Sequence, residues 1–423
     1  MASAHAILVI GLGFGDCGKG SIVDFLARRH SAHTVVRFNG GPQAGHNVVT
    51  ADGRHHTFSQ FGSAALLRGV RTVLSRFMLI EPYALLNEAM HLREIGAADA
   101  LDRLIIDERC AVITPAHQIA NRLREQKRGS NAHGTCGLGI GEAMQDLIER
   151  PEMIIRASEL GNRDVIVRKL REMVKAKDAD CDFASVLSDI SWIDAALENY
   201  TTVARRARIV GGSELRAMLS KEGTTIYEGA QGVLLDQDFG FHPHTTWSHT
   251  TFANAQTLLE ESGFTGRTTR VGVLRSYCTR HGAGPMPTED DGLRPQLREP
   301  HNSDTGAQGR FRVGAFDAVA ARYALRACGG VDGMAITHLD RLCNLPPRIC
   351  TGYRYDDETI EIPFHAAPTL AQMEQITAML RKCRPVFSEY PNSVDGFVKV
   401  IEQQLGPRVM IRSTGPTADD KSD

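Results

Sequence analysis

Several features that would place a protein in a special class are missing from this chain of 423 residues. Its nine cysteines are an odd number without any C-x-x-C pair, which favours reduced thiols in the cytoplasm over a disulfide framework. No apolar run approaches the roughly 20 residues that a membrane-spanning helix needs. The net charge is only −2 at pH 7, so no excess of one sign points to nucleic acid or a membrane surface as a partner. We find no repeat of fixed period.

What is present is the composition of a globular enzyme, with 42% hydrophobic and 23% charged residues. Apolar β-rich runs alternate with helical stretches, which predicts an α/β fold with a large, mostly parallel twisted sheet and helices on both faces. We expect strands at residues 7–10, 34–38, 72–74, 104–106, 225–227, 270–277, 333–337 and 408–411, and helices at 82–95, 143–160 and 316–327. Residues 1–423 are expected to form a single domain, with a helix-rich subdomain at about 110–220 and a frayed end at 418–423.

The most informative segment is GFGDCGKGS at residues 13–21, between the apolar run 7–10 and a helical pattern. This layout of strand, glycine loop and helix presents backbone N–H groups to a phosphate, and Lys19 reaches over the anion. The spacing matches a P-loop, except that Gly20 stands where a hydroxyl would hold Mg²⁺. Asp16, inside the loop, can bind a phosphate-bridging metal or take a proton from the attacking group.

Two other interpretations of this segment stay open. It is also compatible with a glycine-rich turn that binds nothing, and it matches the GxGxxG pattern of a dinucleotide-dependent oxidoreductase. A dinucleotide-binding site requires an acidic residue at the end of the second strand. Here residues 34–38 run into Asn39, Gly40 and Gly41 with no carboxylate, so the phosphate cradle is favoured.

Other strands also end in polar loops. His46 follows the second strand and can neutralise or protonate a departing phosphate oxygen, or it can merely cap a glycine turn. Residues 227–232, 337–340 and 413–416 leave later strands in the same way. The histidines at 242, 244 and 249 lack the ligand number and spacing of a zinc site, so a structural or surface role is favoured for them.

Taken in order, these segments resemble the motifs of the adenylosuccinate synthetase family over nearly the full length. The family's G-D-E-G-K-G appears as GDCGKG at 15–20, and its G-G-H-N-A-G-H appears as GGPQAGH at 40–46. Its F-E-G-A-Q-G-T-L-L-D appears as YEGAQGVLLD at 227–236, and its Y-S-T-R-V-G-A-G-P-F-P-T-E as YCTRHGAGPMPTE at 277–289.

The resemblance implies a GTP-dependent carbon–nitrogen ligase of purine biosynthesis with Mg²⁺ as cofactor and a homodimer as functional unit. Its substrates would be GTP, a purine monophosphate such as IMP, and an amino acid, aspartate above all. Asp16 would take the N1 proton so that the purine O6 attacks the γ-phosphate of GTP, while Lys19 and His46 stabilise the phosphates. The amine would then displace phosphate from C6, and Gln231 would hold the base.

The resemblance also assigns residues to each ligand. For GTP they are Gly15, Cys17, Gly18, Lys19, Gly20, Gly45, His46, His338, Asp340, Ser413, Thr414, Gly415 and Pro416, with Asp340 reading the guanine edge. For the purine nucleotide they are Asp16, Gln43, Thr135, Cys136, Arg150 (from the second subunit), Gln231, Thr246 and Arg310. For the amino acid they are Ala307, Gln308, Gly309, Arg310 and Arg312, and for the metal Asp16 and Gly45.

The chain departs from the family pattern mainly where the amino acid would bind. The family's T-T-G-R-x-R-R-T-G-W is here AQGRFRVGA at 307–315, which keeps two arginines and loses both threonines. Hydroxyl and guanidinium donors of this kind hold a second carboxylate. The alternatives are therefore a specialised paralogue with a different purine nucleotide or amine, or a catalytically silent nucleotide-binding protein. Smaller departures are Cys17 for glutamate, Gln43 for asparagine, Cys136 for threonine, Leu138 for arginine and His338 for lysine.

Overall fold

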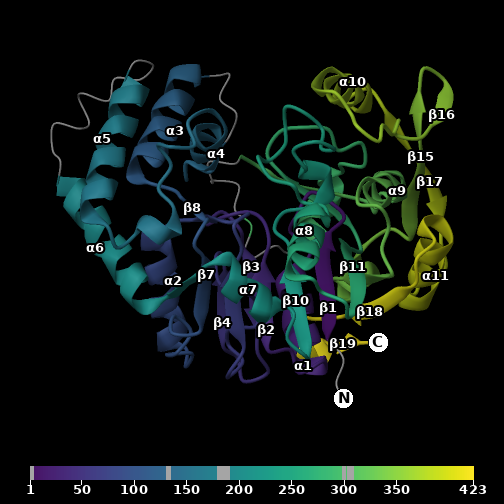
Figure 1. Ribbon diagram of the computed structural model, residues 1–423. Coiled ribbons are helices and arrows are strands. Elements are labelled where there is room, and N and C mark those ends of the chain that lie inside the picture. The colour runs from purple at the N-terminus through teal and green to yellow at the C-terminus, as the bar shows by residue number, and fades with distance from the viewer. Residues whose placement is uncertain (1–3, 130–134, 179–190, 298–301, 303–308) are drawn as a thin grey trace.

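The computed structural model describes residues 4–129, 135–178, 191–297, 302 and 309–423, and a ten-stranded sheet runs through its centre (Figure 1). The strands of this sheet are β1 (His5–Gly11), β2 (Thr34–Arg37), β5 (Arg71–Leu74), β7 (Leu104–Asp107), β9 (Arg208–Val210), β10 (Thr224–Glu228), β11 (Arg267–Arg275), β14 (Gly333–Thr337), β18 (Val409–Ser413) and β19 (Lys421–Ser422). Their order is β19-β18-β14-β11-β1-β10-β2-β5-β7-β9, and every neighbouring pair except β18–β19 is parallel. The predicted α/β architecture is confirmed.

Helices and small sheets surround this centre (Figure 1). The helices are α1 (Lys19–Arg29), α2 (Pro82–Glu94), α3 (Pro115–Arg128), α4 (Ile140–Glu149), α5 (Arg163–Asp178), α6 (Ser191–Arg206), α7 (Gly212–Leu219), α8 (Ala253–Ser262), α9 (Ala318–Ala327), α10 (Leu370–Leu380) and α11 (Val394–Leu405). The small sheets pair β3 (His46–Val49) with β4 (His55–Phe58), β6 (Leu79–Ile80) with β8 (Ala111–Val112), β12 (Cys278–His281) with β13 (Phe311–Gly314), and β15 (Arg348–Tyr355) with both β16 (Glu358–Ile360) and β17 (Arg384–Glu389).

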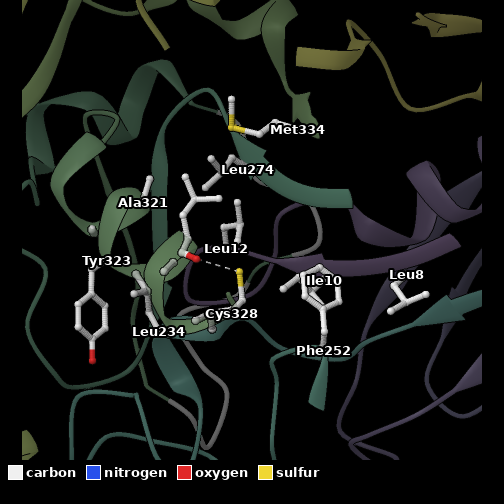
Figure 2. Packing of buried hydrophobic residues seen from close by; sticks show 14 of the residues in the cluster. Leu8, Ile10, Leu12, Leu234, Phe252, Leu274, Ala321, Tyr323, Cys328 and Met334 are labelled. Atoms are coloured by element: carbon white, nitrogen blue, oxygen red, sulfur yellow. Dashed lines mark hydrogen bonds between the residues drawn. The ribbon is translucent and has the colours of Figure 1, made fainter. Parts of the chain in front are cut away.

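The apolar run of β1 reflects burial on both faces of the sheet. Leu8 and Ile10 belong to a hydrophobic cluster built with α8 and α9, part of which Figure 2 shows around Phe252 and Tyr323. Ile7 and Val9, which point to the opposite face, pack in a second cluster with the apolar side of α1. A parallel strand covered on both sides needs apolar residues at every position. The sequence signal was strong for this reason.

A third cluster lies under helices α2, α3, α5 and α6, on the side of the sheet that ends at β9 (Figure 1). Leu170 on α5 and Tyr200 on α6 are buried in it. These helices fall largely within the range 110–220, but the division of the chain into one domain with a helix-rich subdomain stays a prediction. In the part of the chain that the structure describes, no helix combines the length and apolar character that a membrane span requires.

Two sequence-based boundaries are wrong. The helix expected at 143–160 ends at Glu149, because Pro151 disfavours helical backbone in the residue before it and cannot donate a hydrogen bond. The end expected to fray instead forms β19, which pairs antiparallel with β18. Lys421 on β19 donates to the backbone carbonyls of Gly415 and Thr417 at 3.2 and 2.6 Å, so tertiary contacts hold this segment.

The parallel sheet brings the loops with candidate functions to one edge. β1, β2, β10, β11, β14 and β18 point the same way, so the segments that follow them all leave from their carboxyl ends, where ligands bind in open α/β sheets. The side chain of Asn39 links two of these loops, since it accepts from the backbone N–H of Ala230 at 2.7 Å and donates to the carbonyl of Ala230 at 3.3 Å. The candidate site is therefore built across the sheet edge.

Candidate active site

The phosphate loop connects β1 to α1 with an unusual backbone. Gly15, Asp16 and Gly18 have φ values of 93°, 47° and 79°, a left-handed region that glycine and, less often, aspartate adopt. Gly18 precedes the first turn of α1, and no side chain caps that turn. The first N–H groups of a helix have no intrahelical partner and attract anions. The loop therefore has the shape of the predicted phosphate cradle.

Neighbouring segments hold the loop in place. The Thr337 hydroxyl, at the end of β14, donates to the Cys17 carbonyl at 2.9 Å, and the N–H of Leu234 donates to the Gly13 carbonyl at 3.1 Å. Gly232 lies so close to the loop that a Cβ there would collide with the Gly13 carbonyl oxygen. The loop is thus clamped between two strand ends far apart in sequence.

Lys19 and Gln231, both predicted site residues, are in direct contact. The ammonium group of Lys19 is buried and donates to the backbone carbonyl of Gln231 at 2.5 Å. It also lies 3.7 Å from the Cys17 sulfur. Gln231 itself has a left-handed backbone, with φ of 56°. The lysine is positioned at the mouth of the loop by the turn that follows β10.

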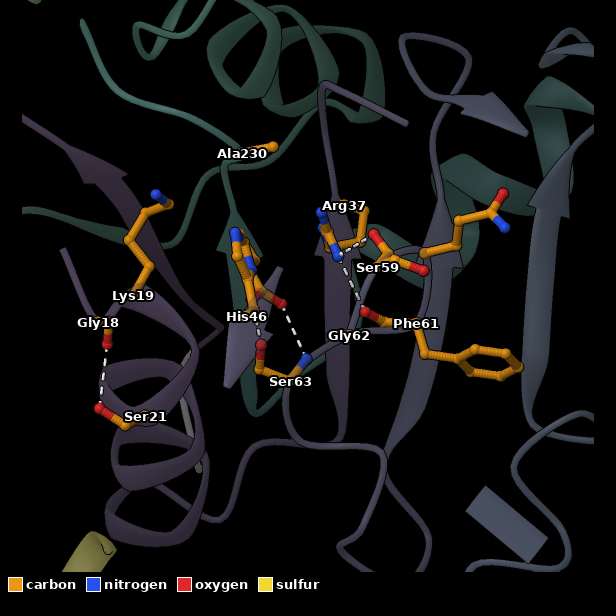
Figure 3. Close-up of polar contacts among 12 residues, drawn as sticks. Gly18, Lys19, Ser21, Arg37, His46, Ser59, Phe61, Gly62, Ser63 and Ala230 are labelled. Atoms are coloured by element: carbon orange, nitrogen blue, oxygen red, sulfur yellow. Dashed lines mark hydrogen bonds and ion pairs between the residues drawn. The ribbon is translucent and has the colours of Figure 1, made fainter. Parts of the chain in front are cut away.

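Close packing of α1 against β3 explains Gly20. A Cβ at this position would lie 2.9 Å from the Cβ of His46 and 3.0 Å from its carbonyl carbon. Figure 3 shows Lys19 on α1 and His46 on the neighbouring β3. The hydroxyl that an ordinary P-loop carries here is excluded, because its space is filled by the strand that delivers His46.

His46 makes a short, buried polar contact with Glu228. Its Nδ1 lies 2.5 Å from one carboxylate oxygen of Glu228, which also accepts from the Ser63 hydroxyl, and the second carboxylate oxygen accepts from the Ser63 N–H at 2.9 Å. Burial lowers the pKa of His46 to about 4, although the carboxylate opposes that shift. His46 is therefore neutral near pH 7, and its Nδ1–H faces Glu228.

Glu228, the buried partner of His46, is a candidate site residue that sequence reasoning did not single out. Burial alone would raise its pKa, but His46, Arg37 and Ser63 together lower it to about 2. Arg37 is fully buried on β2 and donates to the carbonyls of Ser59 and Phe61 at 3.0 and 2.9 Å (Figure 3). Its charge compensates the buried carboxylate. The signal available in the sequence was the acidic residue inside the 227–236 motif.

Two predicted purine-binding side chains each have a hydrogen-bond acceptor without a partner in the described protein. The amide oxygens of Gln43 and Gln231 are buried and have no partner within the described protein. Buried polar atoms are normally paired, so these two oxygens are suited to a ligand. Near them, Gly139 precedes α4 in a left-handed conformation without a side-chain cap, and a Cβ at Gly41 would lie 3.2 Å from the side chain of Ile140 on that helix.

The remaining purine-binding candidates are dispersed. The Thr246 N–H donates to the Leu235 carbonyl at 2.8 Å, which places Thr246 beside the turn after β10. The Thr135 hydroxyl donates to Asn121 on α3 at 3.2 Å, and Cys136 follows it. Arg150 terminates α4, and no described contact joins its side chain to the phosphate loop.

The predicted guanine pocket lies where β14 and β18 end side by side. His338 is partly buried, within 2.8 Å of Arg275 and 2.9 Å of the Thr337 hydroxyl, and desolvation of its ring holds its pKa well below the ordinary value. The Asp340 carboxylate is 36% exposed and forms an ion pair with Arg341 at 3.0 Å. In the loop after β18, the Ser413 hydroxyl donates to the Gly415 carbonyl at 3.2 Å.

Both arginines of the amino-acid loop already have acidic partners. Arg310 forms an ion pair with Asp291. Arg312 lies 2.5 Å from Glu289 and also donates to the carbonyls of Gly282 and Gly284 at 3.0 and 2.9 Å. Arg312 therefore supports the segment that directly follows β12. The predicted residues Ala307 and Gln308 lie outside the described residues, and Gly309 has a left-handed φ of 84°.

The two metal-binding candidates have suitable chemistry. The Asp16 carboxylate is 36% exposed, and Gly45 directly precedes His46, whose strand packs on α1 beside the loop. Carboxylate and carbonyl oxygens are the ligands that Mg²⁺ prefers, usually together with water and substrate phosphates. The residues present fit that ion.

The histidines at 242, 244 and 249 have local partners. His242 contacts the Gln237 carbonyl at 2.6 Å, and His244 contacts Arg381 at 2.7 Å. His249 gathers with Asp236 and Asp238, but the Asp236 carboxylate is already hydrogen-bonded by backbone N–H groups, among them that of Thr250 at 2.5 Å. These contacts agree with the predicted structural role.

The candidate site lies at the edge of a parallel sheet. It contains a buried lysine, a neutral histidine in contact with a carboxylate, and a partly exposed carboxylate in the phosphate loop. These features define a nucleotide-binding enzyme that acts on phosphates. Comparison with known proteins narrows this class. The sequence model of the adenylosuccinate synthetase family matches residues 8–422, and the chain belongs to that family. The family consists of carbon–nitrogen ligases of purine biosynthesis that bind GTP and Mg²⁺.

Individual relatives agree with this assignment. The chain is 32% identical to adenylosuccinate synthetase of Clostridium beijerinckii over 98% of both chains, and 34% identical to that of Vibrio parahaemolyticus over 97% of this chain and 96% of the relative. The solved enzyme of Plasmodium falciparum shares the fold with a TM-score of 0.82 at 23% identity, covering 98% of each chain. The succinoaminodeoxyadenylate synthetase of cyanophage S-2L, solved with dGMP and with dATP as energy donor, superposes with a TM-score of 0.64 at 18% identity, covering 99% and 95%.

Introducing the hydroxyl of an ordinary P-loop should damage this protein. We expect Gly20→Ser to lower the free energy of unfolding by about 1–3 kcal/mol, because the added side chain overpacks the contact between α1 and β3. Urea unfolding gives the measurement. Ser21→Ala is the control, since the Ser21 hydroxyl donates only to the helix backbone at Gly18. An unchanged urea midpoint for Gly20→Ser would show that the hydroxyl has room.

Glu228→Gln tests the partner of His46. The amide keeps an acceptor for Nδ1–H but removes the negative charge that favours protonated His46 when phosphate charge develops. We expect kcat to fall by roughly 10²-fold, as for loss of acid–base catalysis, with little change in the KM for GTP. Glu81→Gln, at a buried carboxylate that caps α2, is the matched control. A kcat within threefold of the parent, a bound of about 0.7 kcal/mol, would remove Glu228 from this role.

Proposed function

We propose that the chain is a GTP-dependent ligase that joins aspartate to C6 of IMP through a 6-phosphoryl intermediate, yielding adenylosuccinate, GDP and phosphate. The observation that carries this proposal is that Asp16, Lys19, His46 and Gln231 are assembled around one loop at the sheet edge. A protein that only binds nucleotide has no need of both a base and a phosphate-stabilising imidazole. Family membership supports the same conclusion.

The first step would transfer the γ-phosphoryl group. Asp16 takes the proton from purine N1, the electron pair moves to O6, and O6 attacks phosphorus while the bond to the bridging oxygen of GDP breaks. Lys19 and the N–H groups at the start of α1 hold the transferring group. His46 is neutral in the free protein, but the negative charge that develops on the diphosphate, together with Glu228, would favour its protonation, and its Nε2–H would then donate to the departing diphosphate. Asp16 and the Gly45 carbonyl would hold Mg²⁺, which when bound would supply charge neutralisation on the phosphates.

The second step would form the carbon–nitrogen bond. The amine nitrogen attacks C6, the C6–O6 bond breaks, phosphate leaves with the oxygen, and the nitrogen gives up one proton to the departing phosphate. Gln231 and Gln43 offer their unpartnered amide oxygens to the purine nucleotide. Thr246, Thr135, Cys136 and the uncapped start of α4 would hold its 5′-phosphate. Asp340, with His338 and residues 413–416, would bind guanine.

One observation favours an altered amine substrate. Arg310 and Arg312, the donors expected for a carboxylate, are paired with Asp291 and Glu289 of the same chain. An incoming dicarboxylate has to compete with these partners. We therefore propose weak use of aspartate, or a preference for another carboxylate-bearing amine, as the second candidate.

Measurement of phosphate release from GTP tests both proposed functions, the use of aspartate and the use of a different amine. IMP with aspartate is assayed first, followed by a panel of purine monophosphates and amines, each with the parent and with Asp16→Ala. Loss of the base should lower kcat by roughly 10²–10⁴-fold while GTP binding is retained. With IMP as co-substrate, saturation at about micromolar aspartate would correspond to a KM at the low end of the range for enzymes. This result would exclude the preference for a different amine. No release with any pair would identify a silent binding protein.

We further propose a homodimer in which Arg150 completes the purine site of the second subunit. Ile148 lies on α4 and Trp247 lies against its first turn, both as exposed large apolar side chains, and Arg150 directly follows α4. Exposed apolar surface of this kind often marks an interface.

Hybrid dimers check the shared site. Arg150→Leu and Asp16→Ala are each expected to be inactive, because each removes one essential group from every site. After subunit exchange, a mixed dimer carries one site with both groups intact. Random mixing at equal amounts then produces hybrids as about half of all dimers, each with one site active, so roughly a quarter of parent activity should return. Exchange confirmed by tagged subunits without any recovery would show that Arg150 acts within its own chain.

A further inference from the structure

The loop that follows β18, residues 413–417, is held by residues that come after it in the chain. The carbonyl oxygen of Asp420 accepts from the N–H of Thr414 at 3.0 Å and from its hydroxyl at 3.2 Å. The Asp420 carboxylate accepts from the N–H and the hydroxyl of Thr417 at 2.8 and 2.7 Å. A Cβ at Gly415 would lie 2.6 Å from the carboxyl carbon of Asp420. The loop is therefore folded closely over Asp420.

Lys421 adds a buried positive charge to this arrangement. The residue is 8% exposed, and its ammonium donates to the carbonyls of Gly415 and Thr417 in the loop. Among the described residues no carboxylate forms an ion pair with it, and burial lowers its pKa to about 8 although Asp420 and Asp24 oppose that shift. An apolar side chain would close this end of the sheet without the cost of burying a charge. The ammonium is therefore better explained by the loop carbonyls that it holds.

The position of Lys421 connects the phosphate helix with the predicted guanine pocket. Helix α1 packs against the short helical turn Ala418–Asp420, which directly precedes β19. The negative charge of Asp24, buried on α1, favours the protonated form of Lys421. On the pocket side, desolvation lowers the pKa of His338, and nearby positive charges, that of Lys421 among them, lower it further. One cation thus acts on both sides of the nucleotide site.

The loop after β18 has to stay in place for a base to be recognised. Strands β14 and β18 are parallel neighbours, so this loop lies beside the segment that carries Asp340. A carboxylate can accept from the N1–H and the 2-amino group of guanine, whereas adenine has no such donor pair. Discrimination of this kind is strong only when the protein groups around the base are held in one geometry.

We propose that Lys421 is a positioning residue for base recognition, which fixes the loop 413–417 beside Asp340 so that guanine is preferred over adenine. This inference rests on the proposed use of GTP. Asp420 supplies the second attachment of the same loop. The phosphate loop is held separately, by Thr337 and Leu234. Loss of Lys421 therefore changes which base is bound far more than how the triphosphate is bound.

Four variants isolate this attachment. Lys421→Met removes the ammonium but keeps a long side chain, and Lys421→Arg keeps a charged donor. Asp420→Ala removes the two hydrogen bonds to Thr417 at a partly exposed position, where a fold defect is less of a concern. Arg29→Met is the matched control, because Arg29 on α1 forms an exposed ion pair with Asp423, next to β19 but outside the loop. The urea midpoint of each variant reports any general loss of stability.

Binding of GTP, ATP and inorganic triphosphate, each with Mg²⁺, is measured by calorimetry. Lys421→Met should bind GTP about tenfold more weakly, with changes of about twofold or less for ATP and triphosphate. Asp420→Ala should weaken GTP binding by about threefold, and Lys421→Arg and Arg29→Met should stay within about twofold of the parent. Equal weakening of GTP and triphosphate would overturn the inference. So would unchanged GTP affinity in both Lys421→Met and Asp420→Ala.

Steady-state kinetics distinguish positioning from catalysis. With the substrate pair that gives turnover in the panel, Lys421→Met should raise the KM for GTP about tenfold and keep kcat within about threefold of the parent. A lower kcat with an unchanged KM would reject the positioning role. If the base preference shifts although no pair gives turnover, the inference stands and the proposed ligase function fails. If turnover requires GTP but the base preference of Lys421→Met equals that of the parent, the proposed function stands and the inference fails.

Discussion

The contact between His46 and Glu228 is the interaction on which the candidate site depends. A fully buried carboxylate is tolerated only when its charge and hydrogen bonds are satisfied, and here His46, Ser63 and Arg37 satisfy them. These groups come from β2, β3, β10 and the segment after β4. By drawing β3 against α1, the same arrangement excludes a side chain at Gly20 and sets the imidazole beside the phosphate loop.

The proposed phosphate-binding and amino-acid-binding parts of the site are preorganised for their ligands to different degrees. On the phosphate side, the loop is clamped by Thr337 and Leu234, and Lys19 is held by a backbone carbonyl, so little rearrangement is needed to receive a nucleotide. On the amino-acid side, Arg310 and Arg312 satisfy carboxylates of their own chain. Binding energy spent on breaking those pairs is lost from affinity. The chain thus combines a candidate phosphate loop that is already held in place with a proposed amino-acid region whose arginines are already paired.

Local patterns predicted most of the fold. Strands covered on both faces, such as β1, have apolar residues at every position, and the glycine loop before α1 has a distinctive composition. Predictions failed where a single residue or a distant contact decided the outcome. Pro151 ended α4 early, and pairing with β18 ordered a C-terminal segment whose composition suggested fraying. The histidine at 281 was visible in the aligned motif, but nothing in the sequence placed it beside Asp16.

The sequence by itself determined the family and the parallel α/β architecture and supplied the candidate residues for phosphate chemistry, because these depend on motifs and on periodicity within short segments. Only the tertiary structure decided the partners of those residues. His46 and Glu228 are 182 positions apart and Lys19 and Gln231 are 212 apart, so no local pattern encodes either contact. Burial, charge compensation and the space available at Gly20 arise when the strand ends meet at one edge of the sheet.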